Sequence, residues 1–134
     1  MKSKLNYGIV SLFFLGFSLL ALVNDSQAKN LMPGEDQYLL TAEKMPAPVG
    51  GFEAIMKKIN YPEMAQRTKT EGKVYILIYV NENGDVDDVK VVKGIGMGCD
   101  DEAQRVVKKA KFTPAMDKGV PVKAKFSLAL TFKL

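Results

Sequence analysis

The chain contains no histidine and no tryptophan, and it has one cysteine, Cys99. Histidine is the commonest general base and the commonest metal ligand, so its absence removes both uses at once. A thiol without histidine also lacks the usual partner that activates a cysteine nucleophile. We therefore predict no catalytic residue, no metal ligand and no cofactor. Cys99 has no internal disulfide partner, so it is either buried or free to link two chains, and we predict that it is buried.

Charge of either sign is not in large excess. The 134 residues include 19 Lys and Arg and 15 Asp and Glu, which gives a net charge of +4. The lysines are spread along the chain and form no basic face interleaved with aromatic residues, so nucleic-acid binding is not predicted. A hydrophobic share of 47% and a charged share of 25% are typical of a globular domain. The length allows one domain and a leader.

Residues 1–28 have the pattern of a secretory signal peptide. Two lysines precede an uncharged, mostly apolar run at residues 8–23, and residues 26–28 (SQA) supply a small-x-small cleavage site. The apolar run is shorter than the roughly 20 residues needed to span a bilayer. We predict export with cleavage after residue 28. The alternative is a short N-terminal membrane anchor formed by residues 8–23.

The next segments predict an arm followed by short helices. Residues 29–49 are polar and irregular with three prolines, which is typical of a flexible arm, and the folded domain then covers residues 50–134. Within residues 52–59, the side chains at i, i+3, i+4 and i+7 are apolar and predict one helix face. Pro62 is well placed as the first residue of a second short helix, Pro62–Thr68.

A β-hairpin is predicted after Gly72. Residues 73–81 (KVYILIYVN) are apolar on both alternating faces, which indicates a central strand. Asn83–Gly84 tolerates positive φ and forms a strong hairpin turn. On the return strand, residues 85–93, Val86 is out of phase with the later valines. This shift predicts a β-bulge at Asp87–Asp88.

A helix and a long strand complete the domain. Residues 99–111 have apolar residues at helical spacing, with Asp100 as the expected N-cap and lysines at the far end. Residues 120–134 carry apolar side chains at every even position, which predicts one long strand with one buried face. The predicted fold is α+β: a three-stranded antiparallel sheet packed against two to three helices, with the last strand at an edge.

Two motifs that suggest a ligand site do not meet its requirements. The glycine-rich turn at residues 94–98 (GIGMG) lacks the third glycine of the dinucleotide fingerprint, because that position is Cys99. Three carboxylates, Asp100 to Glu102, then open the helix and would repel a phosphate. The acidic residues near the hairpin, at positions 85, 87 and 88, do not match the spacing of an EF-hand loop. A solvated turn explains them better.

The order and spacing of these segments closely resemble the C-terminal domain of TonB-family energy transducers. The resemblance covers Gly50–Leu134. The motifs that carry it are Tyr61-Pro62 with Ala65, Gly72 with Val74, Asn83-Gly84 with Val86 and Val89, Asp101-Glu102-Ala103, Phe112 with Pro114, and Val120-Pro121-Val122.

The resemblance implies a periplasmic domain of the Gram-negative envelope that is not an enzyme. Such domains bind the N-terminal peptide of an outer-membrane TonB-dependent receptor by β-strand addition and take part in energy-transducing transmembrane transport. Their energy comes from an inner-membrane proton-driven complex. The partner-binding residues implied here are Lys58, Asn60, Phe126, Ser127, Leu128, Ala129, Leu130, Thr131, Phe132 and Lys133.

A second function stays open on the sequence alone. The sequence contains neither the long proline-rich spacer nor the membrane-helix histidine that the family's transducers carry. The alternative is a soluble periplasmic module that binds another envelope protein, or a second copy of itself, through the same strand edge without transducing energy.

Overall fold

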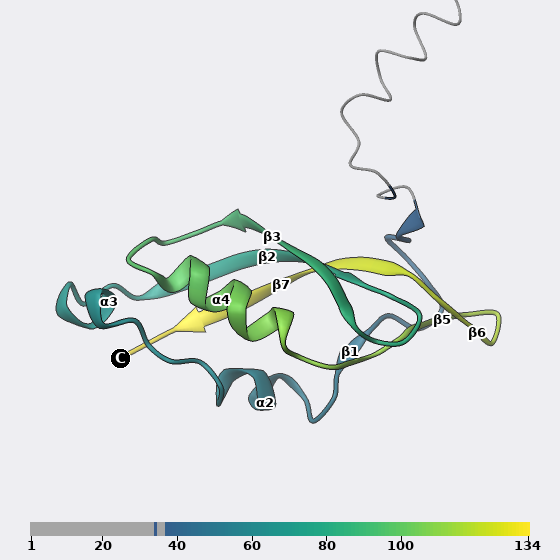
Figure 1. Ribbon diagram of the computed structural model, residues 1–134, viewed down its shortest axis with the longest axis horizontal. Coiled ribbons are helices and arrows are strands. Elements are labelled where there is room, and N and C mark those ends of the chain that lie inside the picture. The colour runs from purple at the N-terminus through teal and green to yellow at the C-terminus, as the bar shows by residue number, and fades with distance from the viewer. Residues whose placement is uncertain (1–33, 35–36) are drawn as a thin grey trace, which may run out of the picture. The chain divides into compact units, whose positions relative to one another are not determined.

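A three-stranded antiparallel sheet organises the residues that the structure, a computed structural model, describes: Gly34 and residues 37–134. The strand order is β3 (Val86–Lys93), β2 (Gly72–Val80) and β7 (Ala124–Phe132), so β2 is central (Figure 1). This arrangement confirms the α+β class, the central position of the first long strand and the edge position of the last one. The predicted leader lies outside the described residues.

One face of the sheet carries the core. Along β2, Val74, Ile76, Ile78 and Val80 are all 0% exposed, because a period of two directs them to the same face. The opposite face is more open, and Tyr75 on it is 40% exposed. The alternation predicted for this strand is therefore confirmed, with one face fully covered.

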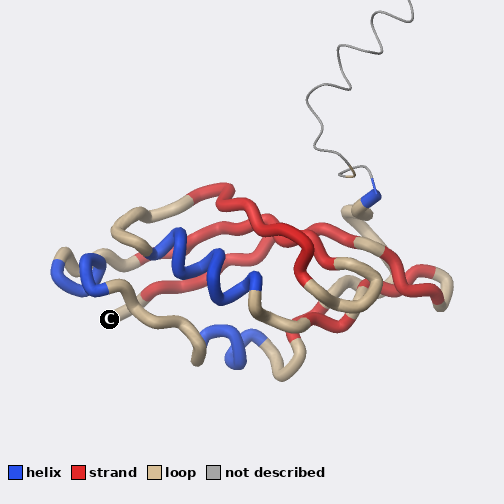
Figure 2. The backbone as a smooth tube through the Cα atoms, viewed as in Figure 1, coloured by secondary structure: helices blue, strands red, loops and turns tan. Residues whose placement is uncertain are grey.

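All three described α-helices contribute to this core. The helix α4 (Cys99–Lys108) lies across the sheet, while α2 (Phe52–Met56) and α3 (Glu63–Arg67) are short and flank it (Figure 2). Each helix buries side chains in the same cluster as the inner residues of β2 and β7. Cys99 is 0% exposed, as predicted, and burial followed by the nearby Asp100 charge raises the pKa of its thiol.

The first two helices are shorter than the sequence pattern predicts. The helix expected over residues 52–59 ends at Met56, and of its predicted apolar face only Ile55 is fully buried. Phe52 is 52% exposed and Met56 is 36% exposed. A helix of five residues is too short to bring i and i+7 onto one face, so Ile59 reaches the core from a turn instead. Similarly, Pro62 is the N-cap of α3 and not its first helical residue.

The predicted N-cap of α4 is wrong. Gly98 is the N-cap, with a left-handed φ of 85°, and Asp100 lies within the first turn. The Asp100 carboxylate instead accepts hydrogen bonds from the backbone N–H groups of Ile95 (2.8 Å) and Gly96 (3.2 Å). It therefore satisfies donors in the preceding loop. The helix ends at Lys108, three residues before the predicted end.

The predicted hairpin and bulge are confirmed. The backbone N–H of Gly84 donates to the carbonyl oxygen of Asn81 (3.0 Å) in the turn between β2 and β3. Tyr79 lies opposite Asp88 while Val80 lies opposite Val86, so Asp87 is the extra residue of the bulge. A second register shift follows near the far end of β3, where Val92 is left over.

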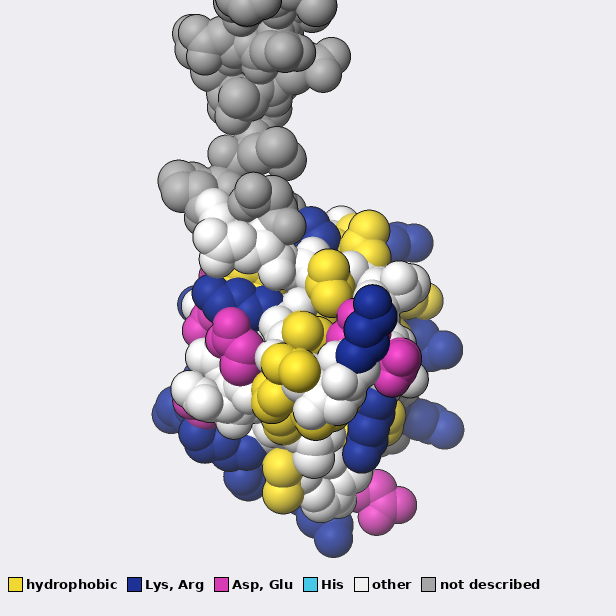
Figure 3. Space-filling model, turned by 90° about the vertical axis from the view of Figure 1, so that its right-hand side faces the viewer, with side chains coloured by type: hydrophobic (Ala, Val, Ile, Leu, Met, Phe, Trp, Pro, Cys, Tyr) yellow, Lys and Arg dark blue, Asp and Glu magenta, His cyan; other side chains and the backbone are white. Residues whose placement is uncertain are grey.

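The last strand is divided. The single strand predicted over residues 120–134 separates into β6 (Val120–Val122), which pairs with β5 (Ala115–Asp117), and β7, which pairs with β2. The apolar alternation is continuous across this break, but the partner strand changes at Lys123. Figure 3 views the end of the domain that carries the β5–β6 hairpin, where basic and acidic side chains surround a few exposed hydrophobic ones.

The second half of the segment interpreted as a flexible arm is hydrogen-bonded to the domain. Within it, β1 (Ala47–Pro48) pairs with β4 (Phe112–Thr113), and Lys44 forms an antiparallel bridge to Met116. Farther upstream, Leu39 forms a parallel bridge to Ala124. The sequence does not indicate these contacts because they are made by backbone groups, which every residue type carries. Within the described part of the chain, no helix is long and apolar enough to cross a membrane.

Gly84→Ala should destabilise the domain far more than the matched substitution Gly119→Ala. A Cβ atom at Gly84 would lie 1.9 Å from the Phe112 carbonyl oxygen, at a φ of 82°. Gly119 has a similar φ of 75° but nothing within 4 Å of such an atom. We expect Gly119→Ala to cost about 1–2 kcal/mol and Gly84→Ala at least about 3 kcal/mol, measured by urea unfolding. Equal losses would contradict the close approach of the two segments.

Candidate functional site

The outer side of β7 is the candidate site, and its backbone geometry follows from the hydrogen bonds at its start. The Lys125 N–H donates to the Leu39 carbonyl oxygen, and the Leu39 N–H donates to the Lys123 carbonyl oxygen, both at 2.9 Å. Backbone groups alternate in direction along a strand. The odd residues of β7 therefore direct their N–H and C=O groups outward, while the even residues direct theirs toward β2.

The outward groups beyond Lys125 form the β7 edge, by which we mean the outer side of residues 126–133. Among the described residues, no backbone hydrogen bond joins the outward groups of Ser127, Ala129 and Thr131 to another segment. Such a row of unpaired donors and acceptors is a template for an added strand.

Side chains along the β7 edge alternate between two environments. Leu130 and Phe132 are 1% and 2% exposed in the core, and Phe126 and Leu128 pack partly against it. The odd positions between them, and Lys133 after them, are exposed on the open face of the sheet. A strand added here would place alternate side chains beside an apolar surface and beside a polar, solvated one.

The opposite edge of the sheet is much less suitable for strand addition. β3 has two register shifts against β2, and bulges bend a strand and interrupt its outward ladder. By contrast, every residue of β7 pairs with β2 in unbroken register, from Ala124 opposite Val80 to Phe132 opposite Gly72. The sheet therefore presents one regular edge, which is the one predicted from the sequence.

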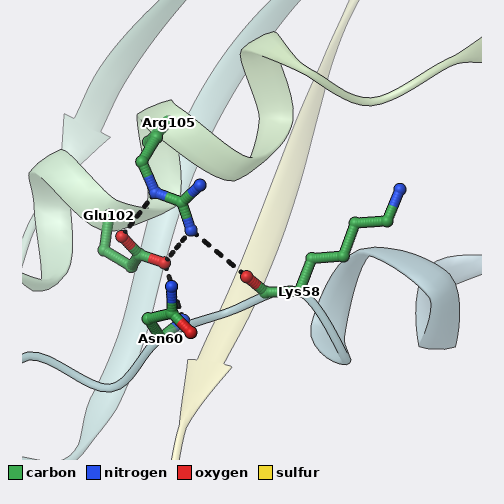
Figure 4. A network of polar contacts seen from close by, with 4 residues as sticks. All are labelled: Lys58, Asn60, Glu102 and Arg105. Carbon is green, nitrogen blue, oxygen red and sulfur yellow. Dashed lines mark hydrogen bonds and ion pairs between the residues drawn. The ribbon is translucent and has the colours of Figure 1, made fainter.

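Two further predicted site residues, Lys58 and Asn60, lie in the turn after α2. A pair on α4 holds this turn in place: Arg105 donates to both Glu102 oxygens, at 2.8 and 2.6 Å. Arg105 also donates to the Lys58 carbonyl oxygen (3.2 Å), and the Asn60 backbone N–H donates to Glu102 (2.7 Å). Figure 4 shows these links and the Lys58 side chain extending away from them.

This turn borders β7 on the helix side of the sheet. The residue after Asn60, Tyr61, packs its ring edge-to-face against Phe132, with 5.8 Å between ring centroids. Tyr61 also lies in the same hydrophobic cluster as Phe126 and Leu128. The structure therefore brings the turn and the C-terminal half of β7 together, although Lys58 and Asn60 contribute backbone groups to α4 and not to the strand.

The electrostatics of this turn centre on Glu102. Hydrogen bonds from Arg105, supported by the Asn60 N–H, hold the pKa of the Glu102 carboxyl below its usual value, although partial burial opposes this. The Glu102 side chain is 12% exposed and that of Arg105 is 39% exposed. The pair is therefore shielded enough from solvent to stabilise the turn, whereas a fully exposed ion pair would contribute little.

The acidic residues near the hairpin each bind different partners. Asp85 forms an ion pair with Lys111, Asp87 accepts from Tyr38 and Asn81, and Asp88 accepts from the neighbouring backbone. Within the described residues, no group of three or more histidine, cysteine or acidic side chains is arranged to hold a metal ion.

Comparison with known proteins identifies the family. Residues 57–134 match the family model described as the Gram-negative bacterial TonB protein C-terminal domain. The chain belongs to this family. The solved structures that are similar to it include two TonB C-terminal domains. The Pseudomonas aeruginosa TonB C-terminal domain has 27% identity over 66% of this chain and 86% of its own length, with a TM-score of 0.49. The Helicobacter pylori domain (residues 179–285) has 31% identity over 62% and 78%, with a TM-score of 0.45. No curated protein sequence matches the chain.

Family membership confirms the resemblance derived from the motifs. TonB C-terminal domains are non-enzymatic transducer domains of the Gram-negative periplasm, and they generally interact with outer-membrane receptors. The sequence reasoning missed Arg105 and the two arm residues Tyr38 and Leu39. A signal existed for Arg105, because it follows Glu102 at the i, i+3 spacing of helical ion pairs. No sequence pattern marks the other two.

Glu102→Gln should lower the free energy of unfolding of the domain and make that free energy less dependent on pH in acid. The folded-state pKa of Glu102 lies below its usual value of 4.5, so the stability it adds is present above pH 4.5 and is lost as pH falls through the folded value. We expect the substitution to cost about 1–3 kcal/mol at pH 7, with a shallower fall in unfolding free energy below pH 4.5.

Glu63→Gln is the matched control for this change. Glu63 forms an i, i+4 pair with Arg67, but the two side chains are 77% and 70% exposed. An exposed pair contributes little, so we expect a loss of no more than about 0.5 kcal/mol. Denaturant unfolding at several pH values measures both variants, and equal effects would show that Glu102 does not hold the turn.

Proposed function

We propose that this domain binds an extended peptide of an outer-membrane TonB-dependent receptor by β-strand addition to the β7 edge, in energy-transducing transport across the outer membrane. The observation that carries the proposal is the unbroken register of β7 against β2, which leaves a straight row of outward backbone groups. Main-chain hydrogen bonds would provide the affinity, and alternate side-chain contacts the selectivity.

The residues of the proposed site have different roles. The backbone groups of Ser127, Ala129 and Thr131 would pair with the incoming strand. Phe126, Leu128, Leu130 and Phe132 shape the apolar side of the edge from within, and the Lys58–Asn60 turn borders that side. Lys133 provides positive charge at the end of the β7 edge, which favours acidic groups on the partner.

A second function uses the same edge without energy transduction. In this case the protein is a soluble periplasmic module that binds another envelope protein or a second copy of itself. The observation that favours it is the sequence of the leader, in which a short apolar run precedes a small-x-small cleavage site. Coupling to an inner-membrane proton-driven complex requires an anchor in that membrane, so the fate of residues 1–28 separates the two functions.

Ser127→Pro or Ala129→Pro should abolish peptide binding while the domain stays folded. Each proline removes an outward N–H donor from the β7 edge and leaves the ladder to β2 intact. With a peptide copied from the N-terminal segment of a receptor from the same bacterium, we expect a loss of about tenfold or more in affinity, measured by calorimetry.

Ser127→Ala is the control, because it keeps the backbone donor and should bind like the unchanged protein. Circular dichroism reports whether each variant is folded. Unchanged affinity in a folded proline variant would rule out strand addition at this edge.

Processing of the leader distinguishes the two functions. The short apolar run and the cleavage site after it predict removal of residues 1–28, which the soluble module requires, whereas the transducer requires that these residues stay in the inner membrane. N-terminal sequencing of the protein from cell envelopes measures this. A mature chain that starts at Lys29 and fractionates as soluble supports the soluble module, whereas an intact leader in the inner membrane supports the transducer.

A further inference from the structure

The start of β7 is already occupied by another part of this chain. Leu39 lies in a parallel bridge to Ala124, and its two backbone hydrogen bonds use the Lys123 carbonyl and the Lys125 N–H. These groups belong to the same outward row as those of Ser127 and Ala129. Leu39 therefore makes, within the chain, the kind of backbone pairing that an added strand would make.

Side-chain contacts of Tyr38 anchor this pairing. Its ring packs edge-to-face against Tyr79 with 5.1 Å between centroids, and its hydroxyl donates to the Asp87 carboxylate at 2.5 Å. The Lys123 ammonium lies 5.5 Å from the centre of the Tyr38 ring. Tyr79 is only 3% exposed although it lies on the open face of the sheet, so Tyr38 helps to cover a large aromatic residue there.

The β-bulge supplies the acceptor for Tyr38. Asp87 is the extra residue of β3, and its other carboxylate oxygen accepts from the Asn81 side chain at 2.9 Å. Burial, followed by the hydrogen bond to Asp87, raises the pKa of Tyr38 to about 12. The hydroxyl therefore keeps its proton and remains a donor at any physiological pH.

The contact is small enough to be reversible. Leu39 is 38% exposed and Leu40 is 69% exposed. An open hollow of about 370 Å³ lies beside Leu39, and it is lined by Gln37, Leu39, Glu82, Pro121, Val122 and Lys123. After Leu40 the chain leaves β7 and next pairs with Met116 at Lys44. Segments with few buried contacts open at low free-energy cost.

We propose that residues Tyr38–Leu40 form a latch, an intramolecular strand that covers the outer side of residues 123–125, directly before the β7 edge, and sets the end of the segment that a partner strand can occupy. The latch and the partner would lie end to end on one edge, the latch at Lys123–Lys125 and the partner from Ser127 onward. A partner strand can reach Lys125 only when the latch is released. The effect on the partner rests on the proposed function, whereas the latch itself does not.

Amide hydrogen exchange of the full chain, followed by NMR, tests the latch directly. The Lys125 amide should be protected in the unchanged protein, since Leu39 accepts its hydrogen bond. Leu39→Pro removes the paired N–H donor, so Lys125 should exchange roughly tenfold faster, close to the rate of Ser127. Leu39→Ala keeps that donor and should leave the rate unchanged. Equal Lys125 rates in all three proteins would overturn the latch.

The effect on a partner is tested by adding the receptor-derived peptide to the same proteins. In the unchanged chain and in Leu39→Ala, protection by the peptide should end at Ser127; in Leu39→Pro it should extend to Lys125. Protection that reaches Lys125 equally in all three would refute the boundary role. If the peptide protects no β7 amide in any variant, the proposed function fails, while the Lys125 rate without peptide still decides whether the latch exists.

Discussion

The unbroken pairing of β7 with β2 is the constraint on which the other features depend. It places a strand with one apolar side at the end of the sheet, so its even residues complete the core while its odd residues hold their backbone groups outward. The same pairing fixes where the Lys58–Asn60 turn can lie, because Tyr61 packs against Phe132 at the end of that ladder. The core residues of β7, its outward backbone groups and the position of the Lys58–Asn60 turn all follow from the register of β7 against β2.

The central strand β2 pairs differently with its two neighbours, and this asymmetry leaves the sheet with one regular edge. Against β3 the register shifts twice, and against β7 it never shifts. Bulged edges resist pairing with other chains, whereas a straight edge invites it. The bulge at Asp87 has a second effect, because it directs a carboxylate to Tyr38 and so anchors the segment that pairs with the start of β7. The bulge at Asp87 therefore makes the outer edge of β3 irregular and, through Tyr38, holds Leu39 beside the start of β7.

Charged side chains hold the irregular segments that surround the sheet. The Arg105–Glu102 pair binds the backbone of the turn after α2, Asp100 binds the loop before α4, and Asp87 binds the arm. In each case a carboxylate or guanidinium satisfies groups that no helix or strand pairs. Such links are directional, so they position a turn or an arm more closely than apolar contact alone.

The sequence by itself determined the fold class, the hairpin with its bulge, the buried Cys99, the edge position of the last strand and the family. These depend on local patterns: period-two alternation from Val74 to Val80, the Asn83–Gly84 turn, and apolar even positions from Ala124 to Phe132. It also placed seven of the proposed partner residues, Phe126 to Phe132, on one strand, because a strand's own pattern sets its buried face. The end of α2 at Met56 and the N-cap of α4 at Gly98 were not predictable in this way, because glycine φ angles and loop acceptors decide them.

Only the tertiary structure decided which contacts surround that strand. The pairing of Leu39 with Lys123 and Lys125, and the binding of Lys58 and Asn60 by α4, join residues far apart in the sequence through backbone groups. Every residue other than proline carries the same backbone donor and acceptor, so composition and spacing hold no record of such a choice. The local pattern predicts that β7 has an outer side, whereas contacts with distant segments such as Leu39 determine how much of that side stays open.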